Sequence, residues 1–144
     1  MDRRQRLGCV GAYFNNEWFS VPFNILHIAH NSRSIAWREL YAIVAAAATW
    51  RHELKGKMVL FHCDNQAICQ IIQTGTSRDP AIMTLVRALF FISAANDFVC
   101  SAEHIEGAHN TAADALSRGA IDKFRRIRPT SHALPTPLEH FNFN

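Results

Sequence analysis

The run from Lys57 to Cys63 (KMVLFHC) constrains the fold of this chain more than any other feature. It is a continuous apolar stretch bounded by turn residues, which is typical of a strand buried in the middle of a sheet. Asp64 follows it directly, and the pattern after it predicts a short helix over 65–73. In sheets of this kind, ligands and catalytic groups cluster at the carboxyl ends of the strands. The sequence therefore places Asp64 at a candidate functional edge.

The remaining patterns predict strands and helices that alternate along the chain. Ser34 is a preferred N-cap residue, and Asp79 followed by Pro80 is a typical helix start. The expected strands are 7–15, 17–23 after a turn at Asn15-Asn16, a short one at 25–30, and 97–105; the expected helices are 36–54, 79–95 and 110–117. This order predicts an α/β layer fold with a mixed sheet covered by helices.

Length and composition are those of one ordinary globular domain. The chain has 144 residues, of which 49% are hydrophobic and 19% charged. No apolar run reaches membrane-spanning length, and the N-terminal segment MDRRQR is not followed by a signal-peptide-like stretch. We therefore expect no membrane association and a cytoplasmic or nuclear, that is intracellular, setting.

The chain changes character after Gly119. Four basic residues are followed by three prolines, namely Lys123, Arg125, Arg126, Arg128, Pro129, Pro135 and Pro137. Prolines interrupt regular structure, so the pattern indicates a folded domain over 1–118 and a linker or tail over 119–144.

The cysteines and the net charge give weaker information. The four cysteines show no C-x-x-C pairing, which favours buried free thiols over a zinc or redox motif. The net charge of +3 is compatible with a phosphate-bearing partner but does not indicate one by itself.

Glu39 is an unusual residue in its predicted helix. Its neighbours three and four positions away are all apolar, namely Ile35, Ala36, Ala42 and Ile43. We therefore expect Glu39 at the buried edge of the helix, where an unpaired carboxylate is costly. A metal ion, or a cation such as Arg38 or Arg51, would offset that cost. A salt-bridged glutamate at the rim is equally consistent with the pattern.

Three further acidic residues are candidates, and each has an ordinary structural explanation. Taken alone, Asp64 fits the cap of the following helix better than a ligand. Thr111 and Asp114 have the spacing of a capping box. Asp2 precedes the first predicted strand and fits a disordered terminus. Together with Glu39, however, these acids would repel one another unless a divalent cation lay among them, which indicates metal-ion phosphoryl chemistry on a nucleic acid.

Several stretches resemble the ribonuclease H domain of retroelement reverse transcriptases. They are Gly8–Ala12, Arg38–Leu40 with Ala42, Cys63–Ala67, and His104–Gly107 through Asn110 to Ala113–Arg118. The last has the pattern H-I-x-G-x-x-N-x-x-A-D-A-L-S-R and is the most specific. Leu85–Phe90 and the segment from Phe124 to Pro137 are similar to the tyrosine-recombinase (DIRS-like) group.

This resemblance implies a mixed five-stranded sheet with helices on both faces, and four acids that bind two Mg²⁺ ions, for which Mn²⁺ can substitute. Glu39, Asp64 and Asp114 match three of the acids, and Asp2 is the candidate for the fourth. The implied reaction is endonucleolytic hydrolysis of the RNA strand of RNA–DNA hybrids. The implied partners are that hybrid and adjacent reverse transcriptase and recombinase domains of a polyprotein.

The first strand of the family pattern is where this sequence departs from it. The family has a full strand that ends in Asp-Ala-Ser, whereas here Met1 precedes Asp2, and Arg3-Arg4 stand in place of Ala-Ser. Either Asp2 is the first acid, or the first strand is cut away. The second possibility favours a catalytically inactive or co-opted module that binds nucleic acid or protein.

Contacts to the nucleic acid are expected from polar residues near the predicted edge and from basic residues. The candidates are Asn65, Asn110, His109, Arg4, Lys57 and Arg78, with Arg6 and Lys55 as further phosphate contacts. His109, in the loop before the last helix, could assist proton transfer, although an ordinary surface histidine also fits. Each basic residue also fits a solvated surface charge.

Overall fold

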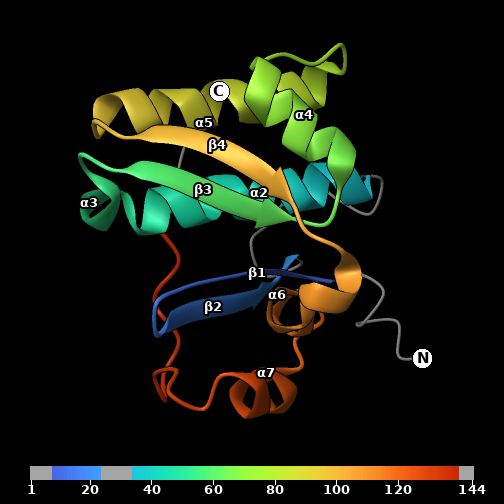
Figure 1. The fold of residues 1–144 in the computed structure, drawn as a ribbon, viewed down its shortest axis with the longest axis vertical. Coiled ribbons are helices and arrows are strands. Elements are labelled where there is room, and N and C mark those ends of the chain that lie inside the picture. Colours follow the sequence, from blue (N-terminus) through green and yellow to red (C-terminus); the bar gives the residue numbers. More distant parts are fainter. Residues whose placement is uncertain (1–7, 24–33, 140–144) are drawn as a thin grey trace. The chain divides into compact units, whose positions relative to one another are not determined.

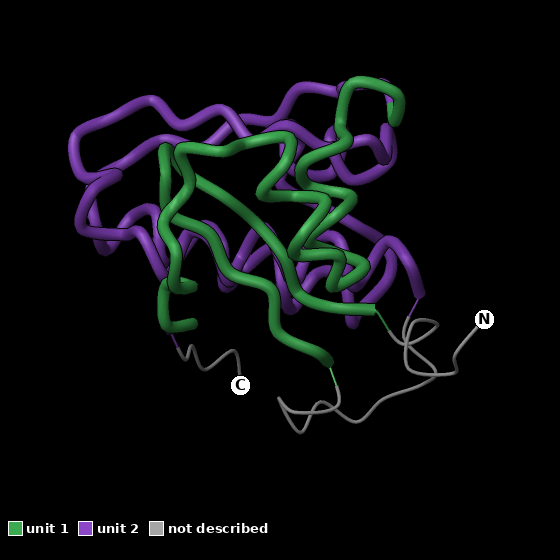
Figure 2. Tube along the Cα trace, turned by 90° about the horizontal axis from the view of Figure 1, so that it is seen from below, with its two compact units in different colours: residues 1–33, 107–138 green, residues 34–106, 139–144 purple. Residues whose placement is uncertain are grey.

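A computed structural model describes residues 8–23 and 34–139 of the chain. It shows an α/β protein that divides into two compact units, coloured separately in Figure 2. The first unit comprises 1–33 and 107–138, and the second comprises 34–106 and 139–144. Each unit is described by itself below.

The second unit is built on a parallel pair of strands, β3 (Met58–Cys63) and β4 (Val99–His104). The pairing runs from Met58 opposite Val99 to Cys63 opposite His104, and the two arrows run side by side in Figure 1. The helices of this unit are α2 (Ile35–Thr49), α3 (Arg51–Leu54), α4 (Gln66–Thr74) and α5 (Pro80–Ala95). Helices α4 and α5 contact these strands, and α2 contacts α4 and α5. Cys100 and Ala102, which point to the same side of β4, are buried, so one face of this strand is covered.

Helix starts in this unit agree with the sequence signals. The side chain of Ser34 accepts a hydrogen bond from Trp37 N at 3.0 Å, and Asn65 Oδ1 accepts one from Ile68 N at 3.2 Å. Asp79 caps α5 in the same way. These bonds satisfy amide groups that have no partner inside the helix. The predictions of the three helix starts are therefore confirmed to within one residue.

The long helix predicted over 36–54 is divided in the structure. Helix α2 ends at Thr49, and Trp50, which is 3% exposed, separates it from α3. Small side chains on α2, such as the fully buried Ala45 and Ala47, suit its close packing against α5, where Leu85 and Leu89 are fully buried. Burial of a leucine side chain contributes about 1.5–3 kcal/mol.

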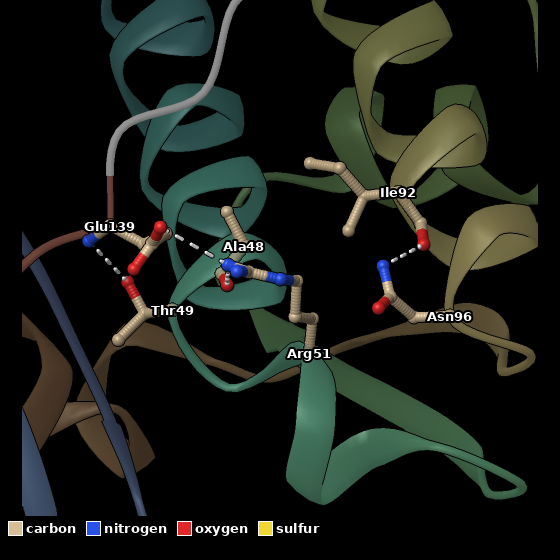
Figure 3. A network of polar contacts seen from close by, with 6 residues as sticks. All are labelled: Ala48, Thr49, Arg51, Ile92, Asn96 and Glu139. Carbon is tan, nitrogen blue, oxygen red and sulfur yellow. Dashed lines mark hydrogen bonds and ion pairs between the residues drawn. The ribbon is translucent and has the colours of Figure 1, made fainter.

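Polar contacts with Thr49 and Arg51 hold Glu139 at the end of α2, within the second unit (Figure 3). Arg51 Nη1 donates to the carbonyl of Ala48 at 2.9 Å and lies 3.4 Å from Glu139 Oε1. The amide of Glu139 donates to Thr49 Oγ1 at 3.2 Å. Both charged side chains are partly exposed, so the ion pair contributes at most about 1 kcal/mol.

The first unit is built on an antiparallel hairpin of β1 (Cys9–Phe14) and β2 (Glu17–Pro22). Its turn at Asn15, with φ 56°, confirms the predicted turn. The unit also contains the short helix η2 (Gly107–His109), α6 (Thr111–Ser117) and α7 (Ile121–Ile127). Strand β1 lies so close to α6 that a Cβ on Gly11 would approach the backbone carbon of Leu116 to 2.6 Å.

Helix α7 lies in the region that we expected to form a linker or tail. Phe124 is fully buried, and its ring lies 5.7 Å from that of Trp18 and 5.8 Å from that of Tyr13. Trp18 Nε1 donates to the carbonyl of His132 at 2.7 Å, so the chain beyond α7 also contacts the hairpin. Ile121 and Phe124 are three residues apart, which is the spacing of apolar residues on one side of a helix. The surrounding basic residues and prolines indicated a linker, so this helix was not expected from the sequence.

The sheet differs from the expected five-stranded sheet. The residues that the structure describes form two separate two-stranded sheets, one antiparallel and one parallel. Apolar patterns predict that a segment is a strand but do not specify which strand lies beside it. The short strand expected over 25–30 lies outside the described residues. Over the two described ranges, none of the helices has the length and apolar character needed to cross a membrane.

Candidate metal-binding site

Glu39, Cys63 and Asp64 come together in the second unit. One potential ligand atom from each residue, a carboxylate oxygen or the Cys63 sulfur, lies within 4.8 Å of the other two. Helix α2 supplies Glu39, and the carboxyl end of β3 supplies the other two residues. The convergence of Glu39 with Asp64 agrees with the expectation drawn from the sequence.

Strand alternation explains how β3 supplies two different side chains. Cys63 is 5% exposed, on the same side of the strand as the half-buried Val59 and Phe61. Asp64 follows it and is exposed. The site therefore has a buried sulfur, a half-buried carboxylate on Glu39, and a carboxylate open to solvent.

Hydrogen bonds fix the thiol of Cys63 in this arrangement. Its Sγ donates to Glu39 Oε2 at 3.2 Å and accepts a bond from the amide of Asn65 at 3.4 Å. The thiol of Cys69 donates to the carbonyl oxygen of Cys63 at 3.7 Å. A thiol thus links Glu39 to β3, whereas Arg51, one of the two cations considered from the sequence, interacts with Glu139.

The carboxyl group of Glu39 holds its proton more strongly than an ordinary glutamate. Its pKa is raised to about 7, and burial is the main cause. The hydrogen bond from Cys63 lowers the pKa, whereas the nearby charge of Asp64 and a hydrogen bond with Asp64 raise it. Two adjacent carboxylates disfavour simultaneous ionisation unless a proton or a cation is shared between them. Near neutral pH the site is therefore suited to exchange a proton for a metal ion.

The two thiols are also shifted. Burial is the main cause that raises the pKa of Cys63, and the charge of Glu39 raises it further. Burial likewise raises the pKa of Cys69. Both residues are free cysteines, and their side chains are therefore protonated thiols at neutral pH.

Asp114 is in the first unit and has a different partner. Arg118 Nε donates to its Oδ1 at 3.1 Å and to its Oδ2 at 3.0 Å. The capping box expected from Thr111 and Asp114 is wrong, because Asn110 occupies the N-cap position and makes no side-chain cap bond. Asp2, the fourth candidate, lies outside the described residues.

The candidate nucleic-acid contacts have varied positions. Asn65 uses its side-chain oxygen to cap α4, and Asn110 lies at the start of α6. His109 is exposed at the end of η2. Lys57 and Arg78 are exposed in the second unit, and Arg4 lies outside the described residues. None of these positions tests the expected role.

Cys63 is the residue of this site that sequence reasoning missed. We expected the cysteines to be buried free thiols, which is correct for Cys63 but leaves out its contact with Glu39. The available signal was alternation along β3, because it places Cys63 on the side of the strand that faces the protein interior, next to the candidate ligand Asp64.

Comparison with known proteins gave no relative. No protein-family model matches the chain, and neither the curated proteins nor the solved structures contain a significant match.

Proposed function

We propose that this chain is a ribonuclease H-like domain that hydrolyses the RNA strand of RNA–DNA hybrids, as part of a DIRS-like retrotransposon reverse transcriptase. The observation that carries the proposal is the meeting of Glu39 and Asp64 at the end of β3, with the pKa of Glu39 raised to about 7. Residues with perturbed pKa values are enriched at functional sites. The family resemblance of the segments around both acids supports the same function.

The carboxylates of Glu39 and Asp64 fit a divalent cation such as Mg²⁺. Mg²⁺ prefers oxygen ligands and is commonly bound by one or two carboxylates together with substrate phosphates. When bound in pairs, such ions activate water and stabilise the leaving oxygen in phosphodiester cleavage. A second Mg²⁺ would require Asp114 to exchange its bond with Arg118 for the ion, and Asp2 is the further candidate ligand. Mn²⁺ can take the same oxygen ligands.

The two acids would have different roles. Asp64 is exposed and can face a substrate phosphate, whereas Glu39 is half-buried and held by Cys63. Glu39 therefore fixes the position of the site, and Asp64 links it to the substrate. A hybrid would be recognised by its shape, phosphates and 2′-hydroxyls and not by its base sequence.

The same proposal specifies the fold and the setting. For a ribonuclease H-like fold, the resemblance implies one mixed five-stranded sheet with helices on both faces. The domain would act beside reverse transcriptase and recombinase domains of one polyprotein, in the cytoplasm or nucleus.

The decisive test is cleavage of a labelled RNA–DNA hybrid with Mg²⁺ and then with Mn²⁺. Asp64→Asn keeps the shape of the side chain and removes its charge. We expect a loss of at least about 100-fold in rate, because loss of an outer-shell partner of a metal ligand alone costs about 10- to 100-fold. Asp97→Asn is the matched control, because it makes the same change at an exposed turn with φ 55°, a conformation that asparagine accepts. Absence of cleavage by the folded wild-type protein would exclude the proposed activity.

A catalytically inactive or co-opted nucleic-acid or protein-binding module is the second candidate. It is favoured by the ion pair between Asp114 and Arg118, which occupies a carboxylate that the catalytic reaction would need. Under this alternative, the wild-type protein binds the hybrid without cutting it, and Asp114→Asn leaves hybrid binding unchanged. Under the catalytic proposal, Asp114→Asn abolishes cleavage.

A further inference from the structure

The site at the end of β3 contains ligand atoms of two chemical kinds. Glu39 and Asp64 offer hard carboxylate oxygens, and Cys63 offers a soft sulfur. Mg²⁺ does not favour sulfur, whereas Zn²⁺ is commonly bound by cysteine thiolates together with carboxylates or histidines. The buried thiol therefore changes which cation the group would hold most tightly.

We propose that Glu39, Cys63 and Asp64 form a Zn²⁺ site, with one coordination position open to water or a ligand. The zinc site rests on these three residues alone. We further propose that Zn²⁺ displaces the catalytic cation and so inhibits cleavage. This second step also rests on the proposed function. Zn²⁺ is then an inhibitor of this protein, and Mg²⁺ or Mn²⁺ its activator.

The separations in the site are close to those of a tetrahedral zinc centre. With Zn–S near 2.3 Å and Zn–O near 2.1 Å, neighbouring ligand atoms lie about 3.4 to 3.6 Å apart. Cys63 Sγ and Glu39 Oε2 are 3.2 Å apart, and the three ligand atoms all lie within 4.8 Å of one another. Asp64 is exposed, so its side chain can rotate to close the remaining distance without disturbing the core.

Metal binding at this site is an exchange of protons for Zn²⁺ without electron transfer. The S–H bond of Cys63 breaks, a Zn–S bond forms, and the thiol proton leaves to solvent; any proton on Glu39 is released in the same way. The thiolate and two carboxylates together carry −3, which Zn²⁺ reduces to −1. The amide of Asn65, 3.4 Å from Sγ, remains available as a hydrogen-bond donor to the bound thiolate.

Cys69 provides a matched control within the same unit. It is also a buried free thiol with a raised pKa, but its hydrogen is donated to the carbonyl of Cys63 and it is not part of the three-residue group. The proposal therefore distinguishes between two neighbouring cysteines of similar chemistry.

Co²⁺ serves as the probe, because it takes zinc sites and gives a near-ultraviolet charge-transfer absorption when bound to a thiolate. We expect the wild-type protein and Cys69→Ser to develop this band at one equivalent of Co²⁺, and added Zn²⁺ to abolish it. Cys63→Ser and Cys63→Ala should lack the band. The proposal is overturned if wild type shows no band, if the band persists without Cys63, or if it is lost only in Cys69→Ser.

Asp64→Asn keeps the test decisive even where the Cys63 variants fail to fold, since Asp64 is exposed. It should weaken Co²⁺ affinity at least about tenfold, because loss of an outer-shell partner of a ligand alone costs about 10- to 100-fold. An unchanged affinity would contradict a role for Asp64.

Hybrid cleavage by the wild-type protein separates this inference from the proposed function. A Co²⁺ band without any Mg²⁺-dependent cleavage would leave the zinc site standing and reject the nuclease. Mg²⁺-dependent cleavage without a Co²⁺ band would support the nuclease and reject the zinc site. If both hold, Zn²⁺ should reduce cleavage at fixed Mg²⁺, and additional Mg²⁺ should restore it; inhibition that Mg²⁺ does not relieve would reject competition at this site.

Discussion

At the scale of single residues, Glu39 has the most informative environment. It is a half-buried carboxyl group that contacts a thiol and a second carboxylate. Burial raises its pKa to about 7, so the folded protein binds its proton more strongly than an unfolded chain with the ordinary value of 4.5. This difference connects the site to the stability of the fold.

The pH dependence of stability follows from this shift. Between pH 4.5 and about 7, folded Glu39 keeps a proton that the unfolded chain has lost, so the free energy of unfolding falls as pH rises through this interval. Glu39→Gln removes the titrating group. We therefore expect the stability of Glu39→Gln relative to wild type to increase from pH 4.5 to 7 and then to level off, as measured by urea unfolding without divalent ions.

Glu53→Gln provides the control for this measurement, because Glu53 is exposed and lies in the same unit. Its stability curve should follow that of wild type across the same pH range. Parallel curves for Glu39→Gln and wild type would show that the environment of Glu39 does not favour its protonated form.

At the scale of elements, caps and close contacts determine where helices begin and how they pack. The predicted caps at Ser34 and Asp79 are confirmed, and Asn65 caps α4 in place of the expected Asp64; each cap depends on a side chain and amides within three residues of it. The contact between β1 and α6 has no such local signal. It depends on Gly11, whose missing side chain leaves room for Leu116.

Asn65→Ala tests the cap of the helix that follows the site. The side-chain oxygen bonds the amide of Ile68 at 3.2 Å, so its loss should cost about 0.5–2 kcal/mol in free energy of unfolding. Asn65→Asp keeps an acceptor at this position and should recover most of that loss. Equal stability of all three proteins in urea unfolding would show that the cap contributes nothing.

Gly11→Ala tests the contact between β1 and α6. A Cβ at this position would lie 2.6 Å from the backbone carbon of Leu116, so strand or helix must move. We expect a loss of about 1–3 kcal/mol in free energy of unfolding, and a greater loss for Gly11→Val. Thermal unfolding temperatures equal to wild type for both variants would contradict the close approach.

At the scale of the whole molecule, both units are assembled from separated parts of the chain. The first unit combines the β1–β2 hairpin with residues 107–138. The second unit combines residues 34–106 with Glu139, which pairs with Arg51. The boundary at 118 expected from the sequence would therefore remove α7 from the unit that contains its partners Trp18 and Tyr13.

Truncation after Arg118 tests this organisation. It removes the fully buried Phe124 and should lower the free energy of unfolding by at least as much as Phe124→Ala, for which we expect about 3–5 kcal/mol. A chain that ends after Glu139 keeps all described contacts and is the control. If truncation after Arg118 leaves urea unfolding unchanged, α7 is a tail, as the sequence alone indicated.

Sequence reasoning succeeded for the candidate site only where a local pattern existed. The apolar neighbours of Glu39 and the position of Asp64 after β3 indicated both acids as candidates, although each pattern also fits an ordinary structural role, and one ligand atom of each lies within 4.8 Å of the other in the structure. Cys63 and the ion pair of Asp114 with Arg118 were not anticipated. Alternation along β3 places Cys63 in the interior but does not identify Glu39 as its partner, and the i,i+4 spacing of Asp114 and Arg118 allows an ion pair without requiring one.

The sequence by itself determined most of the described helices and strands, though not α7 or the division between α2 and α3, and, to within a few residues, where most of them end. Those properties depend on caps, turns and periodicities that act over a few neighbouring residues. The tertiary structure alone decided that Glu39 meets Cys63, 24 positions away, and that Phe124 packs against Trp18. It also decided which strands pair. Such contacts depend on the packing of whole elements, because side chains distant in sequence meet only when the apolar faces that carry them are buried together.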